Sequence, residues 1–102
     1  MSYRDLATKP QPAPLDASGD VWAEIIATLP EGPAKQAAEA RRQMGIDKYG
    51  TPLQRGNGRD HAVDEVQELL DAAVYRAARL GADDPLVGVY LLLAAGILRD
   101  IS

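Results

Sequence analysis

The segment "DHAVDEVQELLDAAVYRAARL", residues 60–80, decides the fold. Its apolar residues recur at the three- and four-residue spacing of an α-helix and therefore share one face. That face is formed by Val66, Leu69, Leu70, Ala73, Ala77 and Leu80. Asp60 or Asn57 can cap the start of this helix, and Gly81 can end it. Phe is absent and no strand pattern competes, so we predict an all-α protein.

Three further helices are expected on either side of this segment. Apolar residues at helical spacing predict a helix over residues 20–29, with Ser18 or Asp20 as its cap. A second helix is predicted over 34–47, after a proline suited to a first helical turn. The last is predicted over 85–100, opened by an Asp-Pro pair.

The N-terminal residues differ from the rest of the chain in composition. Residues 1–17 contain three prolines and little periodicity, so we expect an extended or disordered arm. The remaining residues, 18–102, are expected to form one all-α domain of four helices, since a chain of 102 residues can bury only a modest core.

Charge and composition exclude several classes of function. The formal net charge of −4 argues against binding of a nucleic-acid polymer, although local cations can still bind a small phosphate ligand. With no cysteine there is no disulfide framework and no thiolate metal site. The most apolar run, Leu86 to Leu98, is too short to span a bilayer, and no signal peptide is visible. We expect a cytoplasmic protein without a membrane partner.

The last predicted helix is apolar around its whole circumference, which one small bundle cannot cover. Its apolar residues are Leu86, Val87, Val89, Tyr90, Leu91, Leu92, Leu93, Ile97 and Leu98. We therefore predict a homo-oligomer built on a two-fold axis, in which either this helix or the helix predicted over 20–29 is buried at the contact. The latter helix adds Trp22, Ile25 and Ile26.

Carboxylates form a narrow stripe on the helix predicted over 60–80. At about 100° per residue, Asp64, Glu68 and Asp71 fall on one side, with Glu65 on the flank. Two interpretations remain open. The stripe is either a solvated acidic face or part of a Mg²⁺ or Mn²⁺ site, because hard cations prefer carboxylate oxygens on a rigid element.

Two motifs resemble a known family. "ELLD", Glu68 to Asp71, resembles the second half of the E-x-x-E and E-x-x-D pair of the MazG-like all-α nucleoside triphosphate pyrophosphohydrolases, and "QAAE", Gln36 to Glu39, occupies the place of the first half. The stretch "GIDKYGTPLQRGNGRD" also resembles small phage-encoded proteins grouped with that family.

The resemblance implies a four-helix MazG-like bundle that assembles as a dimer or a dimer of dimers. It implies Mg²⁺-dependent hydrolysis of an NTP or dNTP to the monophosphate and pyrophosphate. Glu39, Glu68 and Asp71 would be catalytic and would hold the metal together with Glu65. Gln36 departs from the motif because an amide supplies no charge. The alternative is therefore a degenerate member that binds a nucleotide without turnover, as a sponge for a host immune signal.

The loop "DKYGTPLQRGNGRD", residues 47–60, supplies cations for such a ligand. Its candidate contacts to phosphate or ribose are Lys48, Arg55 and Arg59. Tyr49 can stack on a base, and Asn57 can read a base edge or make a turn. The other interpretation is an ordinary connection between helices with Asn-Gly turn chemistry. Trp22 is expected in the core, and His61 is expected at the surface or as a cap.

Overall fold

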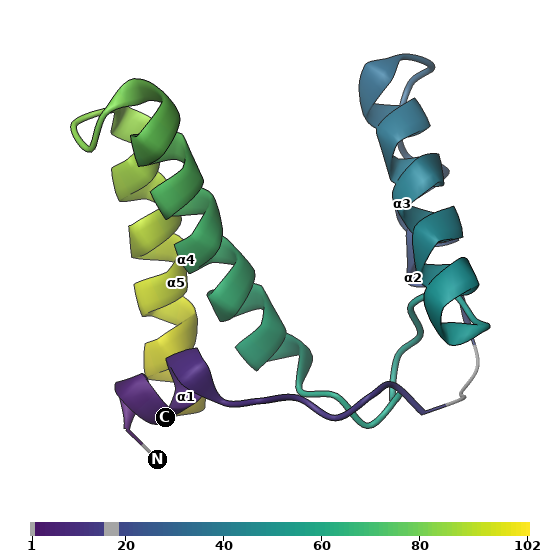
Figure 1. Ribbon diagram of the computed structural model, residues 1–102, viewed down its shortest axis with the longest axis horizontal. Helices are drawn as coiled ribbons and strands as arrows, with labels where there is room; N and C mark the ends of the chain where they lie inside the picture. The colour runs from purple at the N-terminus through teal and green to yellow at the C-terminus, as the bar shows by residue number, and fades with distance from the viewer. Residues whose placement is uncertain (1, 16–18) are drawn as a thin grey trace. The chain divides into compact units, whose positions relative to one another are not determined.

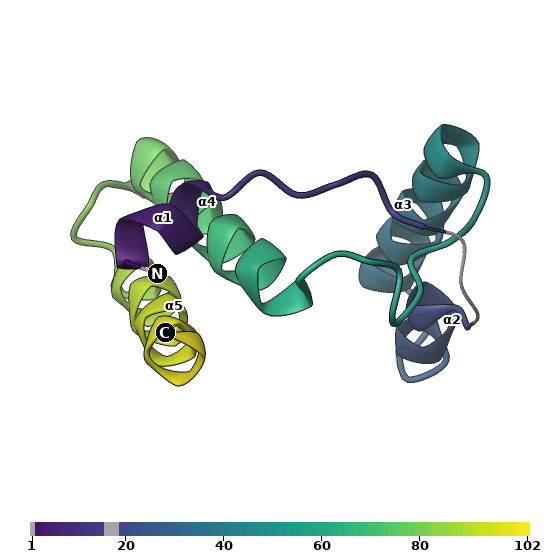
Figure 2. The ribbon, with the colours of Figure 1, turned by 90° about the horizontal axis from the view of Figure 1, so that it is seen from below.

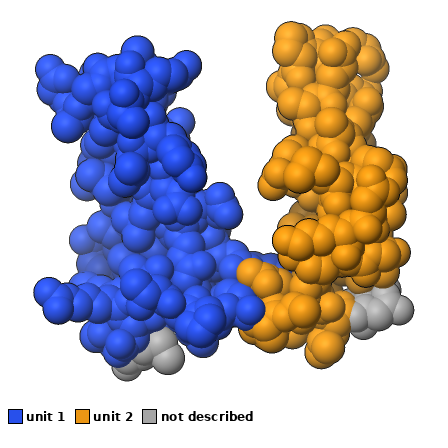
Figure 3. Space-filling model, in the orientation of Figure 1, with its two compact units in different colours: residues 1–11, 60–102 blue, residues 12–59 orange. Residues whose placement is uncertain are grey.

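The computed structural model describes residues 2–15 and 19–102, and all regular structure in these residues is helical (Figure 1). The all-α class is thus confirmed. The chain forms two compact units, one of residues 1–11 and 60–102 (unit 1) and one of residues 12–59 (unit 2), which Figure 3 colours separately. The division between the two units falls at residues 11/12 and 59/60.

Unit 1 is built on a helical hairpin. Helix α4, His61–Leu80, and helix α5, Pro85–Ile101, run antiparallel and pack along their length (Figures 1 and 2). A third helix, α1, Tyr3–Thr8, packs on α4. The buried apolar side chains of unit 1 are Leu6, Val63, Val66, Ala73, Val87 and Ala94. The apolar face predicted for α4 therefore forms the core only in part: Val66 and Ala73 are buried, whereas Leu80 is 50% exposed.

The ends of α4 and α5 follow the local sequence signals. The Asp60 carboxylate accepts hydrogen bonds from the backbone N–H groups of Ala62 and Val63 at the start of α4. Gly81 ends the helix with a φ of 98°, which a glycine adopts without steric cost. Asp84 then caps α5 by accepting from the Leu86 N–H. These boundaries agree with the predicted ranges because caps depend on neighbouring residues only.

The prolines suggested an extended or disordered N-terminal arm, but part of this arm is helical. Tyr3–Thr8 form α1, which begins with a capping box between Ser2 and Asp5. The side chain of Gln67 on α4 donates to the backbone carbonyl oxygen of Lys9 at 2.8 Å and so fixes the chain after this helix. The expectation of an extended arm missed this helix, because it depends on a short local motif and on a contact with a distant residue.

Unit 2 contains two helices. Helix α2, Val21–Ile26, packs on helix α3, Pro33–Tyr49, which begins with proline at its first position. Asp20 caps α2 by accepting from the Ala23 N–H. Ser18, the other predicted cap, lies outside the described residues. Helix α2 is shorter than the predicted 20–29, and α3 extends two residues beyond the predicted end.

Helix α5 leaves much of its apolar surface uncovered. Its exposed large apolar side chains are Leu86, Val89, Leu91, Leu92, Leu93 and Ile101, and Leu92 is 74% exposed. None of the helices in the described ranges is long and apolar enough to cross a lipid bilayer.

The turn between α4 and α5 makes a pH-dependent contribution to stability. Arg76 Nε donates to Asp84 Oδ1 at 2.9 Å, and this hydrogen bond holds the pKa of Asp84 below its usual value. A carboxylate with a lowered pKa stabilises the fold above its unfolded pKa, and this stability is lost as the pH falls through the folded pKa. We expect Asp84→Asn to lower the urea midpoint at neutral pH and to differ little from the unmodified chain in acid.

The control for this prediction is Asp83→Asn, at an exposed neighbouring acid with no ion pair among the described residues. Urea unfolding followed by circular dichroism at a series of pH values measures both variants. An Asp84→Asn effect of constant size from neutral to acid pH would contradict the prediction.

Candidate functional site

A cavity of about 340 Å³ lies entirely within unit 2. Helix α2 contributes Trp22, α3 contributes one face, and the loop after α3 contributes residues between Thr51 and Arg59. Pro14, from the segment before α2, completes the wall. Segments far apart in the sequence therefore meet here around one hollow.

The α3 face of the cavity follows from helical spacing. The lining residues of this helix are Arg41, Met44, Gly45, Lys48 and Tyr49. Each of them lies three or four residues from another member of the set, so all five project from one side of α3. Two of the predicted ligand contacts, Lys48 and Tyr49, are in this set. Arg41 also belongs to this set, although the sequence analysis did not identify it. It lies seven residues, or two helical turns, before Lys48, and this spacing could have indicated that the two share a face.

The charge of the cavity is positive. Arg41, Lys48 and Arg59 line it, and among the described residues 2–15 and 19–102 no aspartate or glutamate is part of its wall. No carboxylate of the described residues lies within ion-pair distance of Arg41 or Lys48. Three other cations of unit 2 are neutralised outside the cavity: Lys35 by Glu31 at 2.7 Å, Arg42 by Asp20 at 2.7 Å and Arg55 by Glu24 at 2.6 Å. The cavity thus holds cationic charge that an anionic ligand can neutralise.

Two aromatic side chains border the same hollow. Trp22 is only partly buried and lines the cavity, so the expectation that it belongs to the core is wrong. Tyr49 is 47% exposed, and the Lys48 ammonium lies 5.1 Å from the centre of its ring. This distance is within the range of a cation–π contact. Cations and aromatic rings are therefore adjacent, as a ligand with both an anionic group and a flat ring would require.

Asn57 organises the loop wall of the cavity. It is 1% exposed, its side-chain oxygen accepts from the Arg59 N–H at 3.2 Å, and its backbone oxygen accepts from the Leu15 N–H at 2.7 Å. Its Nδ2 has no hydrogen-bond partner among the described residues. Arg59 in turn donates from Nη1 to the Pro12 carbonyl oxygen at 2.7 Å. The turn that Asn57 makes therefore fixes the loop against the preceding segment.

Arg55 does not belong to the cavity. Its guanidinium pairs with Glu24 of α2, and its side chain is 69% exposed. Of the five predicted ligand contacts, Lys48, Tyr49, Asn57 and Arg59 line the cavity and Arg55 lies elsewhere.

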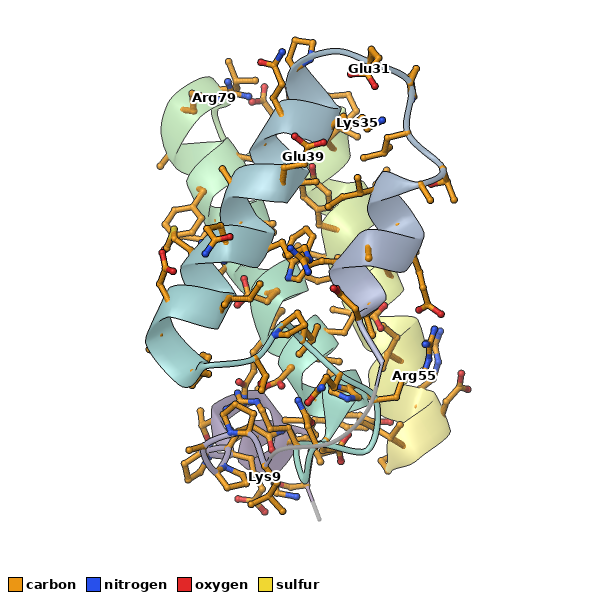
Figure 4. All side chains as sticks on the ribbon, turned by 90° about the vertical axis from the view of Figure 1, so that its right-hand side faces the viewer. Lys9, Glu31, Lys35, Glu39, Arg55 and Arg79 are labelled. Carbon is orange, nitrogen blue, oxygen red and sulfur yellow. The ribbon has the colours of Figure 1, made fainter. Side chains whose placement is uncertain are left out.

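Glu39, the predicted metal ligand on α3, also lies away from the cavity. Nine residues at about 100° each separate it from Lys48, which places the two on opposite sides of the helix. Glu39 borders a second hollow beside Arg42 and α2. Figure 4 shows Glu31 just before α3 and Lys35 and Glu39 in the first half of this helix, with Arg55 toward the other end of unit 2. Within unit 2, Glu39 and the cationic cavity are therefore separate features.

The remaining predicted metal ligands, Glu65, Glu68 and Asp71, are exposed on α4 in unit 1. Asp71 and Glu68 share a side of the helix, three residues apart. Across the described ranges 2–15 and 19–102, no group of three or more histidine, aspartate or glutamate side chains is arranged to hold a metal ion. The predicted Mg²⁺ site stays a prediction.

Comparison of the chain with protein-family models, with curated proteins and with solved structures finds no significant match.

Proposed function

We propose that this protein binds a nucleotide in the cavity of unit 2. The observation that carries the proposal is a pair of cations, Arg41 and Lys48, beside two aromatic rings in the cavity. Within the part of the chain that the structure describes, neither cation has a carboxylate partner and no acid lines the cavity. Arginine and lysine bind phosphate oxygens through charge-assisted hydrogen bonds. Trp22 and Tyr49 offer ring faces on which a base can stack.

The size and chemistry of the cavity support a small ligand and not a polymer. A volume of about 340 Å³ is at the lower end of the range for pockets that bind small molecules. The net charge of −4 on the whole chain disfavours a phosphate backbone, whereas the local cations suit one ligand with a few phosphates. The resemblance of residues 45–60 to small phage-encoded MazG-like proteins supports the same class of ligand.

Two features favour binding without turnover. Glu39 lies on the opposite side of α3 from Lys48, so a metal held by Glu39 would not face the cavity. Gln36 replaces the first acid of the family motif and supplies no charge for a cation. The function that the site supports best is therefore sequestration of an intact nucleotide in the cytoplasm, for example a nucleotide immune signal of a phage host.

Calorimetry with a panel of ribonucleotides and deoxyribonucleotides in EDTA tests the binding proposal. Loss of a hydrogen bond to a charged group costs about 1.5–3 kcal/mol, or about tenfold or more in affinity. We expect Arg41→Ala and Lys48→Ala each to weaken the best nucleotide by that factor. Arg55→Ala, which removes an arginine outside the cavity, should leave the affinity within about twofold, given the small contribution of exposed ion pairs. Absence of binding by every nucleotide of the panel would refute the proposal.

A second candidate function is hydrolysis, which the "ELLD" acids on an exposed side of α4 favour. Carboxylates are the donors that Mg²⁺ prefers, so Glu65, Glu68 and Asp71 of α4 are of a residue type that suits the ion, as is Glu39 of α3 by itself. Bound Mg²⁺ would polarise a phosphate and lower the pKa of water. The reaction would convert an NTP or dNTP to its monophosphate and pyrophosphate.

A pyrophosphate-release assay with Mg²⁺ and the same panel decides this candidate. We expect activity of a true hydrolase to fall by at least about 10²-fold in Glu68→Gln, because the variant removes a charged metal ligand that acts in the transition state. Asp83→Asn, at an exposed acid in the turn after α4, is the control. Release no greater than that of Glu68→Gln would end the hydrolysis candidate and leave the binding proposal intact.

We also propose that the protein is a homo-oligomer built on α5. The exposed side chains Leu86, Val89 and Leu93 recur at spacings of three and four residues and form an apolar stripe, with Leu92 beside it. Contiguous apolar surface of this kind on a soluble protein marks an interface.

We expect Leu92→Asp to shift the protein from oligomer to monomer, because a carboxylate in an apolar interface costs several kcal/mol. Leu92 is 74% exposed within the chain, so the variant should keep its helical circular-dichroism spectrum. Ala82→Asp adds the same charge at an exposed turn position and should keep the oligomer. Light scattering measures all three proteins, and a monomeric unmodified chain would overturn the proposal.

A further inference from the structure

Gly45 stands in the interior of α3 without a steric reason within the protein. A glycine inside a helix costs roughly 0.5–1 kcal/mol relative to alanine. A Cβ built at Gly45 meets no atom of the described residues within 4 Å, and its φ is not in the left-handed region. Neither close packing nor backbone conformation therefore explains why this position lacks a side chain.

The position of Gly45 in the cavity offers an explanation. Gly45 lies four residues after Arg41 and three before Lys48, on the face of α3 that lines the hollow. Both neighbours carry long cationic side chains, whereas the helix backbone is bare between them. The cavity thus has a smooth floor bordered by two cations that have no carboxylate partner in the described ranges 2–15 and 19–102.

We infer that the ligand places a flat ring directly against the α3 backbone at Gly45, while its phosphates reach Arg41 and Lys48. This inference rests on the proposed nucleotide binding and assigns Gly45 as a specificity-determining residue for the ring. The floor suits a ring and not a phosphate, because the backbone N–H groups in the interior of a helix already donate to carbonyl oxygens. The side chains of Trp22, Met44 and Leu53 supply apolar contacts around the same floor.

The inference predicts effects of opposite sign on stability and on binding. Gly45→Ala should raise the midpoint of thermal unfolding, because alanine is the better helix former and its methyl group meets nothing. The same methyl group should occupy the place of the ring and weaken nucleotide binding by about tenfold or more. A residue with a merely structural role would not change stability and affinity in opposite directions.

The matched control is Gly96→Ala in the interior of α5, where a Cβ also meets nothing within 4 Å. It should raise the unfolding midpoint in the same way and leave nucleotide affinity unchanged, because α5 does not line the cavity. Inorganic tripolyphosphate serves as a ligand with the charge but no ring. Gly45→Ala should leave its affinity within about twofold, whereas Lys48→Ala should weaken both ligands.

Calorimetry in EDTA and thermal unfolding are measured on the full chain for all variants. Unchanged nucleotide affinity in Gly45→Ala, an equal loss for tripolyphosphate, or a lowered unfolding midpoint would each overturn the inference. If the unmodified chain binds no nucleotide, the proposed function fails and this inference fails with it. If the unmodified chain binds and Gly45→Ala binds equally well, only the inference fails.

Discussion

The carboxylate of Asp20 is the contact that joins the two helices of unit 2. It accepts from the Ala23 N–H at the start of α2 and pairs with Arg42 of α3 at 2.7 Å. The hydrogen bond from Arg42 holds the pKa of Asp20 below its usual value. The next residue, Val21, donates its N–H to the Leu53 carbonyl oxygen of the loop. Two adjacent residues thus connect α2, α3 and the loop, the three parts that surround the cavity.

This dependence on polar contacts reflects how little apolar surface unit 2 buries. Among its described residues, Ala38 is the one buried apolar side chain, whereas unit 1 buries six. Each ion pair near the surface contributes little to the free energy of unfolding. Its main effect is to fix where the two side chains lie. The pairing of Arg42, Arg55 and Lys35 with carboxylates elsewhere leaves positive charge concentrated at the cavity. The electrostatic character of the site is therefore a consequence of how unit 2 is held together.

The sequence was sufficient to predict features that depend on neighbouring residues. The caps at Asp60 and Asp84 and the stop at Gly81 lie where the local signals indicate, because each involves hydrogen bonds over four residues or fewer. The apolar face of α4 was likewise readable from its spacing. Helix α1 was missed because prolines follow it and its contact with Gln67 joins residues far apart in the sequence.

The candidate site could be predicted only in part, for the same reason. Lys48, Tyr49, Asn57 and Arg59 were predicted from the cationic, glycine-rich composition of residues 47–60, and all four line the cavity. Arg55 has the same composition signal, but its partner Glu24 lies on another element, and no spacing rule connects them. Trp22 and Arg41 come from helices whose relative rotation is a tertiary property. Their place in the cavity was therefore beyond reach of periodicity alone.

The contacts at the two points where the chain passes between the units have a topological consequence. The Gln11 side chain donates to the Asp60 carbonyl oxygen at 3.0 Å and accepts from the Asp60 N–H at 3.2 Å, so residues 11 and 60 lie side by side. Residues 12–59 thus have the connectivity of an inserted module, because the residues that precede and follow them, Gln11 and Asp60, are hydrogen-bonded to each other. Bringing the ends of so long a segment together has an entropic cost that grows only slowly with its length. The two hydrogen bonds between Gln11 and Asp60 offset part of that cost. An insertion or an exchange of the whole module would therefore leave the α4–α5 hairpin of unit 1 continuous.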